Sequence, residues 1–216
     1  MTTLCSAEWC ISRLVAVGVR AAIFDIGGVL EVTSAMTFIA DWLGRLRLSF
    51  DDVGPELIEI WAAGELGTVT ESQVREAIRT GLSVDQQIAD AVITDMWKQY
   101  LGVANTELID YVARLRPRFR TGLLSNSFVG ARQRESAAYG FEELVDEIVY
   151  SHEVGMTKPD PEIYLLACRR LGVEPGEAVF VDDSEMAVTG AESVGITAIL
   201  HESNARTIST LDALLS

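Results

Sequence analysis

Short apolar runs rich in β-branched residues recur along the chain and end in polar residues or glycines. They cover residues 21–25, 121–125, 178–182 and 197–200, and residues 147–150 form a weaker fifth run. Each run is typical of a buried strand. Helical periodicity separates the runs at residues 129–139, 161–171 and 186–194. Strands that alternate with helices in this way pair in parallel through right-handed crossovers, so the pattern predicts an α/β fold with a doubly wound parallel sheet.

The alternation stops between residues 34 and 102, where the periodicity is helical throughout. Phe38, Trp42 and Leu46 share one helical face, and Thr70 with Gln73 three residues later predicts a capping box. A helical insertion directly after the first strand is expected to lie over the carboxyl edge of the sheet as a cap. The alternative is that these helices form one more face of the core.

The predicted sheet and the helical insertion divide the chain into domains. Residues 20–33 and 103–216 are expected to form the α/β core, and residues 34–102 the helical cap. Residues 1–19 fit neither pattern and are expected to be a loosely attached extension.

The charge balance narrows the choice of partners. The formal net charge is −15, with 17 Lys and Arg against 32 Asp and Glu. Nucleic acid is therefore not an expected partner, because binding to a phosphate backbone requires a basic surface. An anionic substrate would need a bound cation or a local lysine to offset this field.

The apolar segments and the cysteines of the sequence indicate a cytoplasmic location. The apolar stretch 14–24 follows Glu8 and is interrupted by Arg20, which is unlike a signal peptide, and no run reaches the roughly 18 apolar residues of a membrane span. Cys5, Cys10 and Cys168 form neither a disulfide framework nor a metal-ligand pattern. We therefore expect a cytoplasmic protein without a membrane partner.

Polar side chains stand where the predicted strands end or where a helix begins. Because the carboxyl ends of parallel strands meet at one edge of a sheet, these side chains are expected to converge. The set comprises Asp25, Ser125, Asn126, Lys158, Asp182 and Asp183. Taken singly, each of them could be only a helix cap or a turn residue; their joint occurrence is what points to chemistry.

The converging set suits phosphoryl transfer. Carboxylates held close together favour a hard cation such as Mg²⁺, which prefers oxygen ligands. That cation and the Lys158 ammonium would neutralise a phosphoryl group, while Ser125 and the amides after it would hold a phosphoryl oxygen. Asp25 is then placed to attack phosphorus and form an aspartyl phosphate that water later hydrolyses.

Over residues 20–203 the chain resembles the haloacid dehalogenase-like hydrolase superfamily, whose four motifs match the segments around Asp25, Ser125, Lys158 and the Asp182–Asp183 pair. The resemblance implies that Asp25 is the nucleophile and that Lys158 is the conserved lysine of the site. It implies that Ser125, with Asn126 beside it, binds the phosphoryl group. The implied Mg²⁺ ligands are Asp25, Asp182, Asp183 and the Gly27 carbonyl, and the helical insertion resembles the cap that screens substrates.

Two positions depart from the pattern. The phosphatases of the superfamily usually carry a second Asp two residues after the nucleophile, where this chain has Gly27, and glycine cannot donate a proton. The Phe-Asp-Ile-Gly-Gly segment is most similar to the branch of sugar-phosphate phosphatases that lacks this Asp. Glu31, Glu65 or the substrate itself remain as alternative proton donors. Ala187 replaces a common Asp or Asn, which removes a contact to the metal or to Lys158.

The leading hypothesis is a Mg²⁺-dependent phosphatase of a small phosphorylated metabolite. A metal-independent 2-haloacid dehalogenase is the first alternative, but Asp182 and Asp183 would repel a carboxylate substrate, and residues 31–40 contain no Arg to clamp it. The second alternative is a catalytically weak binding or regulatory protein on the same fold. The sequence leaves the substrate and the oligomeric state open.

Overall fold

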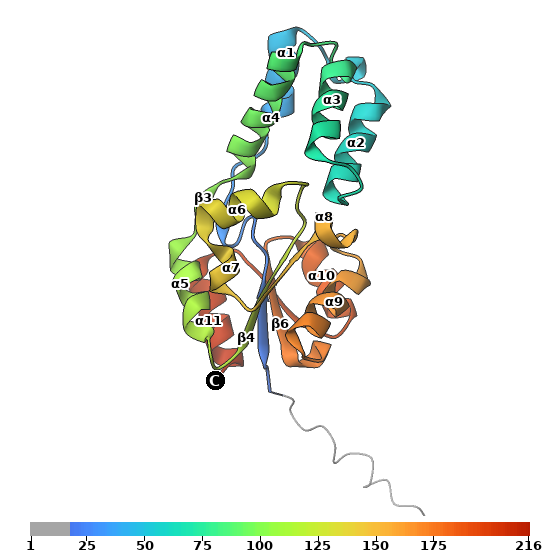
Figure 1. Cartoon of the computed structure of the whole chain (residues 1–216). Coiled ribbons are helices and arrows are strands. Elements are labelled where there is room, and N and C mark those ends of the chain that lie inside the picture. Colours follow the sequence, from blue (N-terminus) through green and yellow to red (C-terminus); the bar gives the residue numbers. More distant parts are fainter. Residues whose placement is uncertain (1–17) are drawn as a thin grey trace, which may run out of the picture.

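The computed structural model of the chain describes residues 18–216, so the extension expected over residues 1–19, with Cys5 and Cys10, lies almost wholly outside the described residues. A parallel five-stranded sheet of order β5-β4-β1-β6-β7 forms the centre of the molecule (Figure 1). All five expected strands are present, with bounds within a residue of those predicted. They are β1 (Ala21–Phe24), β4 (Arg120–Ser125), β5 (Glu147–Tyr150), β6 (Ala178–Asp182) and β7 (Thr197–Leu200).

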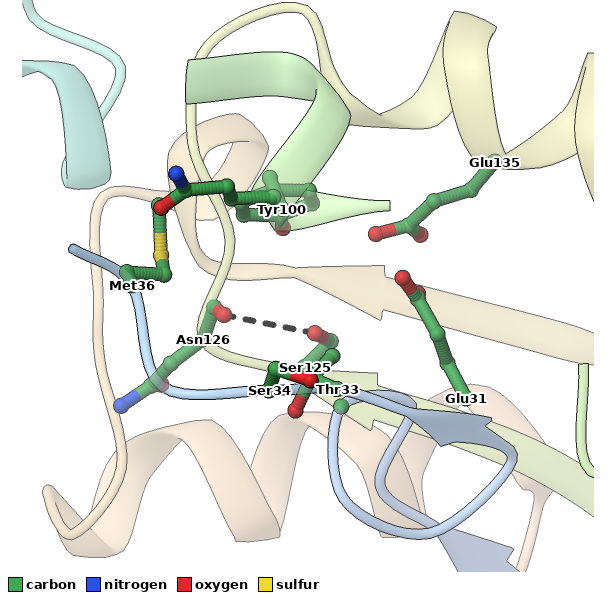
Figure 2. Close-up of a pocket in the computed structure, with 10 residues that line it drawn as sticks. Glu31, Thr33, Ser34, Met36, Tyr100, Ser125, Asn126 and Glu135 are labelled. Carbon is green, nitrogen blue, oxygen red and sulfur yellow. Dashed lines mark hydrogen bonds between the residues drawn. The ribbon is translucent and has the colours of Figure 1, made fainter. Parts of the chain in front are cut away.

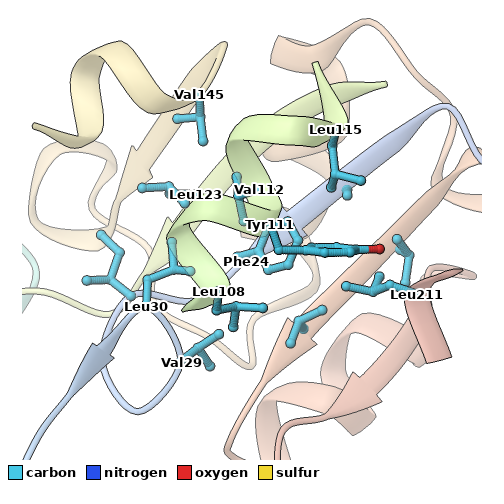
Figure 3. Close-up of a cluster of buried hydrophobic side chains, with 14 of the residues drawn as sticks. Phe24, Val29, Leu30, Leu108, Tyr111, Val112, Leu115, Leu123, Val145 and Leu211 are labelled. Carbon is cyan, nitrogen blue, oxygen red and sulfur yellow. The ribbon is translucent and has the colours of Figure 1, made fainter. Parts of the chain in front are cut away.

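Helices cover both faces of this sheet, as the doubly wound prediction requires. One face carries α5 (Thr106–Leu115), α7 (Phe141–Leu144) and α11 (Asn204–Leu214), and the other carries α9 (Pro161–Leu171) and α10 (Glu185–Ser193) (Figure 1). The alternation of side chains along β1 explains this arrangement. Ala22 and Phe24 pack with the first group of helices (Figure 3), whereas Ala21 and Ile23 pack with the second.

Two helix starts differ from the sequence prediction, each because of one residue. The helix expected over 129–139 is α6 (Ala131–Tyr139), which begins after Gly130, whose φ of 95° is left-handed. The helix expected over 186–194 is α10, which begins one residue earlier. There the Ser184 hydroxyl accepts a hydrogen bond from the Ala187 N–H and caps the first turn.

The register of β1 between its neighbours sets the position of the polar strand ends. Phe24 pairs with Leu123 of β4 on one side and with Val181 of β6 on the other. The Asp25 N–H continues the ladder with a 2.9 Å hydrogen bond to the Val181 carbonyl. Asp25 therefore leaves the sheet at the same edge as the ends of β4 and β6.

The insertion after β1 is a layer of its own above this edge, which confirms the cap and excludes the alternative of one more core face (Figure 1). Its helices enclose a separate apolar cluster around Trp42, Ile78 and Met96. The Thr70–Gln73 capping box is present at the start of the third helix. The cap elements are α1 (Phe38–Leu46), the short η2 (Phe50–Asp52), α2 (Pro55–Glu65), α3 (Glu71–Gly81) and α4 (Gln86–Tyr100).

The two chain segments that join the cap to the core lie side by side. β2 (Glu31–Val32) pairs antiparallel with β3 (Val103–Ala104), so the chain leaves and re-enters the core through one small ladder. The ladder lies close to residues 33 and 103, where the sequence analysis places the domain boundaries, and that division stays a prediction. Two short elements, α8 (Ser151–Val154) and η3 (Pro175–Glu177), complete the core. Within residues 18–216, none of the helices is both long and apolar enough to cross a membrane.

Candidate active site

The Lys158 ammonium lies between two carboxylates at the carboxyl edge of the sheet. Its Nζ is 2.8 Å from Asp25 Oδ1 and 2.6 Å from Asp182 Oδ2. All three side chains are nearly buried, with exposed fractions of 5% for Lys158, 12% for Asp25 and 1% for Asp182. Buried charges of this kind persist only when they are paired, and here the pairing joins three segments that are far apart in the sequence.

This pairing leaves an excess of negative charge. Burial raises the pKa of Asp25 to about 7, and Asp182 adds to the rise while Lys158 opposes it. Burial alone would lower the pKa of Lys158, but Asp25 and Asp182 outweigh it and raise that pKa, which keeps the ammonium charged. One further cation beside Asp25 would favour its ionised form, the form that can act as a nucleophile.

A third carboxylate completes an acidic group that fits a divalent cation. One oxygen each from Asp25, Asp182 and Asp183 lies within 4.8 Å of the others. Burial, and then the neighbouring Asp182, raise the pKa of Asp183. In the part of the chain that the structure describes, no N–H donates to the Gly27 carbonyl, which leaves that oxygen free as a further ligand. Carboxylate and carbonyl oxygens are the hard ligands that Mg²⁺ takes, usually one or two carboxylates together with water and phosphate oxygens.

Gly28 is required by the close approach of Asp183. Its φ of 74° lies in the left-handed region, and a Cβ on it would stand 2.1 Å from Asp183 Oδ2. At Gly27, by contrast, a Cβ would meet no atom within 4 Å. The position of Asp183 therefore requires glycine at residue 28, whereas the space around Gly27 would admit a larger side chain.

Ser125 ends β4 and Asn126 follows it, and the side chain of Asn126 contacts Lys158. Its Nδ2 donates to the Lys158 carbonyl over 3.0 Å, and its Oδ1 accepts from the Lys158 N–H over 2.7 Å. Both polar atoms of the side chain therefore hold the Lys158 main chain, and the phosphate-binding role expected for Ser125 and Asn126 stays a prediction. Among residues 18–216, the Ser125 hydroxyl makes only one hydrogen bond, a 3.4 Å contact with the Asn126 carbonyl.

A small cavity of about 130 Å³ opens beside these residues (Figure 2). Gly27, Ser125 and Asn126 line its inner end. Glu31 and Glu135 point toward one another at its other side, as Figure 2 shows. The cavity is of a size that admits only a small group, and most of the residues that line it carry polar side chains.

Glu135 is the buried carboxylate of this cavity that sequence reasoning missed. It is 1% exposed, and the Tyr150 hydroxyl donates to its Oε2 over 2.6 Å. Burial raises the pKa of Glu135 to about 7; Tyr150 opposes the rise and Glu31 adds to it. No sequence signal could have found it, because α6 is polar on almost every face.

The two carboxylates named as alternative proton donors occupy different places. Glu31 is 1% exposed and accepts a hydrogen bond from the Gly102 N–H, where the chain returns from the cap. Glu65 ends α2 and lines a second cavity of about 170 Å³ that adjoins the first. Burial raises the pKa of both side chains.

Comparison with known proteins gives the family and several relatives. The model of the family described as haloacid dehalogenase-like hydrolase matches residues 19–195. A phosphorylated carbohydrates phosphatase of Thermotoga maritima is 26% identical over 83% of each chain. A D-ribitol-5-phosphate phosphatase of Bacteroides thetaiotaomicron is 22% identical over 87% of this chain and 94% of its own.

Other relatives match over shorter shares of their length. A glyceraldehyde 3-phosphate phosphatase of Methanopyrus kandleri is 33% identical, but over 38% of this chain and 35% of its own. The chain spans 19% of the mouse acyl-CoA dehydrogenase family member 10, at 28% identity over 91% of this chain.

Solved structures share the fold. A HAD family enzyme of Bacteroides thetaiotaomicron superposes with a TM-score of 0.73 at 24% identity, over 87% of this chain and 95% of its own. A 2-haloacid dehalogenase of Pseudomonas syringae reaches a TM-score of 0.63 at 20% identity, over 91% and 98%. These likenesses show the architecture, and the family match over residues 19–195 shows the membership: the chain belongs to the haloacid dehalogenase-like hydrolase family.

Proposed function

We propose that this hydrolase is a Mg²⁺-dependent phosphatase that cleaves phosphate monoesters of small organic molecules. The observation that carries the proposal is the Lys158 ammonium held between Asp25 and Asp182, with the Asp183 carboxylate beside them. Two relatives named for phosphorylated carbohydrates and for D-ribitol 5-phosphate support the substrate class. A structure of the Bacteroides HAD family enzyme is described as a complex with magnesium and inorganic phosphate, which supports the cation.

Mg²⁺ would be held by Asp25, Asp183, Asp182 and the Gly27 carbonyl, and when bound it would neutralise phosphoryl oxygens and keep Asp25 ionised. Asp25 supplies the nucleophile: one of its oxygens forms a bond to phosphorus while the ester P–O bond breaks and the alkoxide departs. Lys158 and Ser125 would stabilise the charge on the phosphoryl oxygens. Water then attacks phosphorus, which releases phosphate and restores the carboxylate.

The departing oxygen needs a proton that Gly27 cannot supply. Loss of a general acid costs about 10²- to 10⁴-fold in rate, so we expect slow turnover of alkyl esters and faster turnover of good leaving groups. The cap over residues 34–102 would exclude water from the site during transfer to Asp25.

The test is hydrolysis of p-nitrophenyl phosphate and of a panel of sugar and polyol phosphates, with Mg²⁺ and with a chelator. We expect release of phosphate that requires Mg²⁺ and is abolished in Asp25→Asn. If no ester of the panel is cleaved faster than by the Asp25→Asn protein, the proposal is wrong. Chelator-resistant release of chloride from 2-chloropropionate would support the dehalogenase instead.

A further inference from the structure

A buried carboxyl group lies in the small cavity beside the catalytic edge. Glu135, on α6, is 1% exposed and lines this cavity of about 130 Å³ together with Gly27 and Ser125. Ser125 is the last residue of β4, and Asp25 directly follows β1, which pairs in parallel with β4. The cavity therefore borders the two adjacent strand ends between which the phosphoryl group lies in the proposed mechanism.

Gly27 leaves room in this cavity where the usual proton donor of the family would stand. A Cβ on Gly27 would meet no atom within 4 Å. A side chain from another part of the fold therefore has space to serve the departing oxygen from across the cavity. Two carboxyl groups are available there, Glu31 on β2 and Glu135 on α6, and Figure 2 shows them facing one another.

No positive charge compensates these two carboxyl groups. None of the residues that line the cavity is a Lys, Arg or His. Among residues 18–216, neither Glu31 nor Glu135 forms an ion pair. Glutamate is almost never fully buried without a charged partner, and two facing carboxylates repel unless one of them holds a proton. The cavity therefore stores a proton beside the catalytic edge.

The surroundings of Glu135 favour that proton near neutral pH. Burial raises its pKa to about 7, and the charges of Glu31 and Asp25 add to the rise, whereas the hydroxyls of Tyr150 and Tyr100 oppose it. Only nearby charges act in this way, so Glu135 lies within electrostatic reach of the nucleophile Asp25. The Tyr150 hydroxyl donates to Oε2 over 2.6 Å, which fixes the carboxyl group through one oxygen and leaves the other to carry the proton. A group of this kind in a catalytic cavity is typical of acid–base chemistry.

We propose that Glu135 donates the proton that the departing oxygen of the phosphate ester takes up. This inference rests on the proposed phosphatase function and adds a catalytic residue to it. As the ester P–O bond breaks, the alkoxide oxygen takes the proton of the Glu135 carboxyl group and leaves as the alcohol. When water attacks the phosphorus of the aspartyl phosphate, the Glu135 carboxylate accepts one proton from that water, which restores the acid. Because Glu135 acts from across the cavity, it replaces only part of what a donor at residue 27 would contribute, and slow turnover of alkyl esters is still expected.

The test is Glu135→Gln, assayed with Mg²⁺ on phosphate esters whose leaving groups range from p-nitrophenol to sugar and alkyl alcohols. We expect kcat/KM for alkyl esters to fall about 10²-fold, the lower end of what a general acid contributes, and kcat/KM for p-nitrophenyl phosphate to change little, because nitrophenolate leaves without protonation. In the wild type, the ratio of the two values should fall as pH rises past about 7, and in Glu135→Gln it should stay constant. Glu143→Gln, the same change at an exposed carboxylate on α7, is the control and should behave like the wild type.

A double variant separates the loss of a proton donor from damage to the fold. Gly27→Asp combined with Glu135→Gln should restore hydrolysis of alkyl esters, because it supplies a donor two residues after the nucleophile. Failure of this rescue, with p-nitrophenyl phosphate still cleaved, would contradict the inference.

Three other outcomes overturn the inference in distinct ways. An equal loss on p-nitrophenyl phosphate and on alkyl esters would give Glu135 a purely structural role and leave the phosphatase function standing. A loss that depends on the leaving group in Glu31→Gln, but not in Glu135→Gln, would assign the proton to Glu31. Failure of the wild type to cleave any ester, p-nitrophenyl phosphate included, would contradict the phosphatase function itself.

Discussion

The Asn126 side chain forms two hydrogen bonds with the main chain of Lys158, one to its carbonyl and one from its N–H. These bonds tie the end of β4 to the loop that carries the ammonium between Asp25 and Asp182. The orientation of Lys158 therefore depends on a residue that does not touch the ammonium. Groups of this kind around a reactive centre typically contribute 10- to 100-fold to activity.

We expect Asn126→Ala to lower kcat of p-nitrophenyl phosphate hydrolysis about 10- to 100-fold, because Lys158 loses its fixed position. Asn126→Asp should be similarly impaired, since its oxygen would face the Lys158 carbonyl. Inhibition by inorganic phosphate should weaken together with kcat in Asn126→Ala, because Lys158 also contacts the phosphoryl oxygens in the proposed mechanism. Weaker phosphate inhibition with full kcat would instead mean that Asn126 binds phosphate directly and does not act through Lys158.

Substitutions of Gly27 and Gly28 test whether the acidic group of Asp25, Asp182 and Asp183 binds Mg²⁺. Gly28→Ala should weaken Mg²⁺ binding at least tenfold, because the new Cβ would displace the Asp183 carboxylate and the φ of 74° is strained for alanine. Gly27→Ala should bind Mg²⁺ like the wild type, because a Cβ there meets no atom within 4 Å. Isothermal titration with MgCl₂ checks both. Equal affinities in the two variants would contradict the assignment of Asp183 as a ligand.

The open space at Gly27 also permits a gain of function. Gly27→Asp restores a proton donor, so it should raise kcat for alkyl phosphates by about tenfold or more and change p-nitrophenyl phosphate little, because nitrophenolate leaves without protonation. Gly27→Asn, which has nearly the same shape, is the control and should give no gain. Equal effects of Asp and Asn on both substrates would show that leaving-group protonation is not what the site lacks.

The raised pKa of Glu135 predicts that the stability of the protein depends on pH. Burial raises the pKa of this carboxyl from an ordinary 4.5 to about 7, so the folded protein holds a proton that the unfolded chain has lost over that range. The wild-type free energy of unfolding should therefore fall, relative to that of Glu135→Gln, as pH rises from 5 to 8, by on the order of 2 kcal/mol.

Urea denaturation of both proteins at pH 5 and pH 8 measures this difference. Glu143→Gln, which changes an exposed carboxylate on α7, is the control and should show no such trend. A constant difference between wild type and Glu135→Gln across the range would mean that Glu135 is ionised in the folded protein throughout.

The sequence was sufficient to predict the sheet and the convergence of Asp25, Lys158 and the Asp182–Asp183 pair at its carboxyl edge. Apolar runs ending at Asp25 and Asp182 identify buried strands, and parallel pairing then brings their polar ends together without further information. The hydrogen bonds of the Asn126 side chain could not be predicted, because their partner, Lys158, lies on a loop more than 30 residues away that only the folded chain places beside it. Glu135 could not be predicted for a different reason: in the sequence, a buried carboxylate on a polar helix cannot be told apart from an exposed one.

The most direct test of the central claim is a search for phosphate covalently bound to Asp25. The enzyme would be mixed with Mg²⁺ and a ³²P-labelled phosphate monoester, quenched in acid within milliseconds, and digested for peptide mapping. We predict label on the peptide that contains Asp25, its loss on a chase with unlabelled substrate, and none in Asp25→Asn. Continued hydrolysis by Asp25→Asn, or turnover by the wild type with no label on that peptide, would contradict the account.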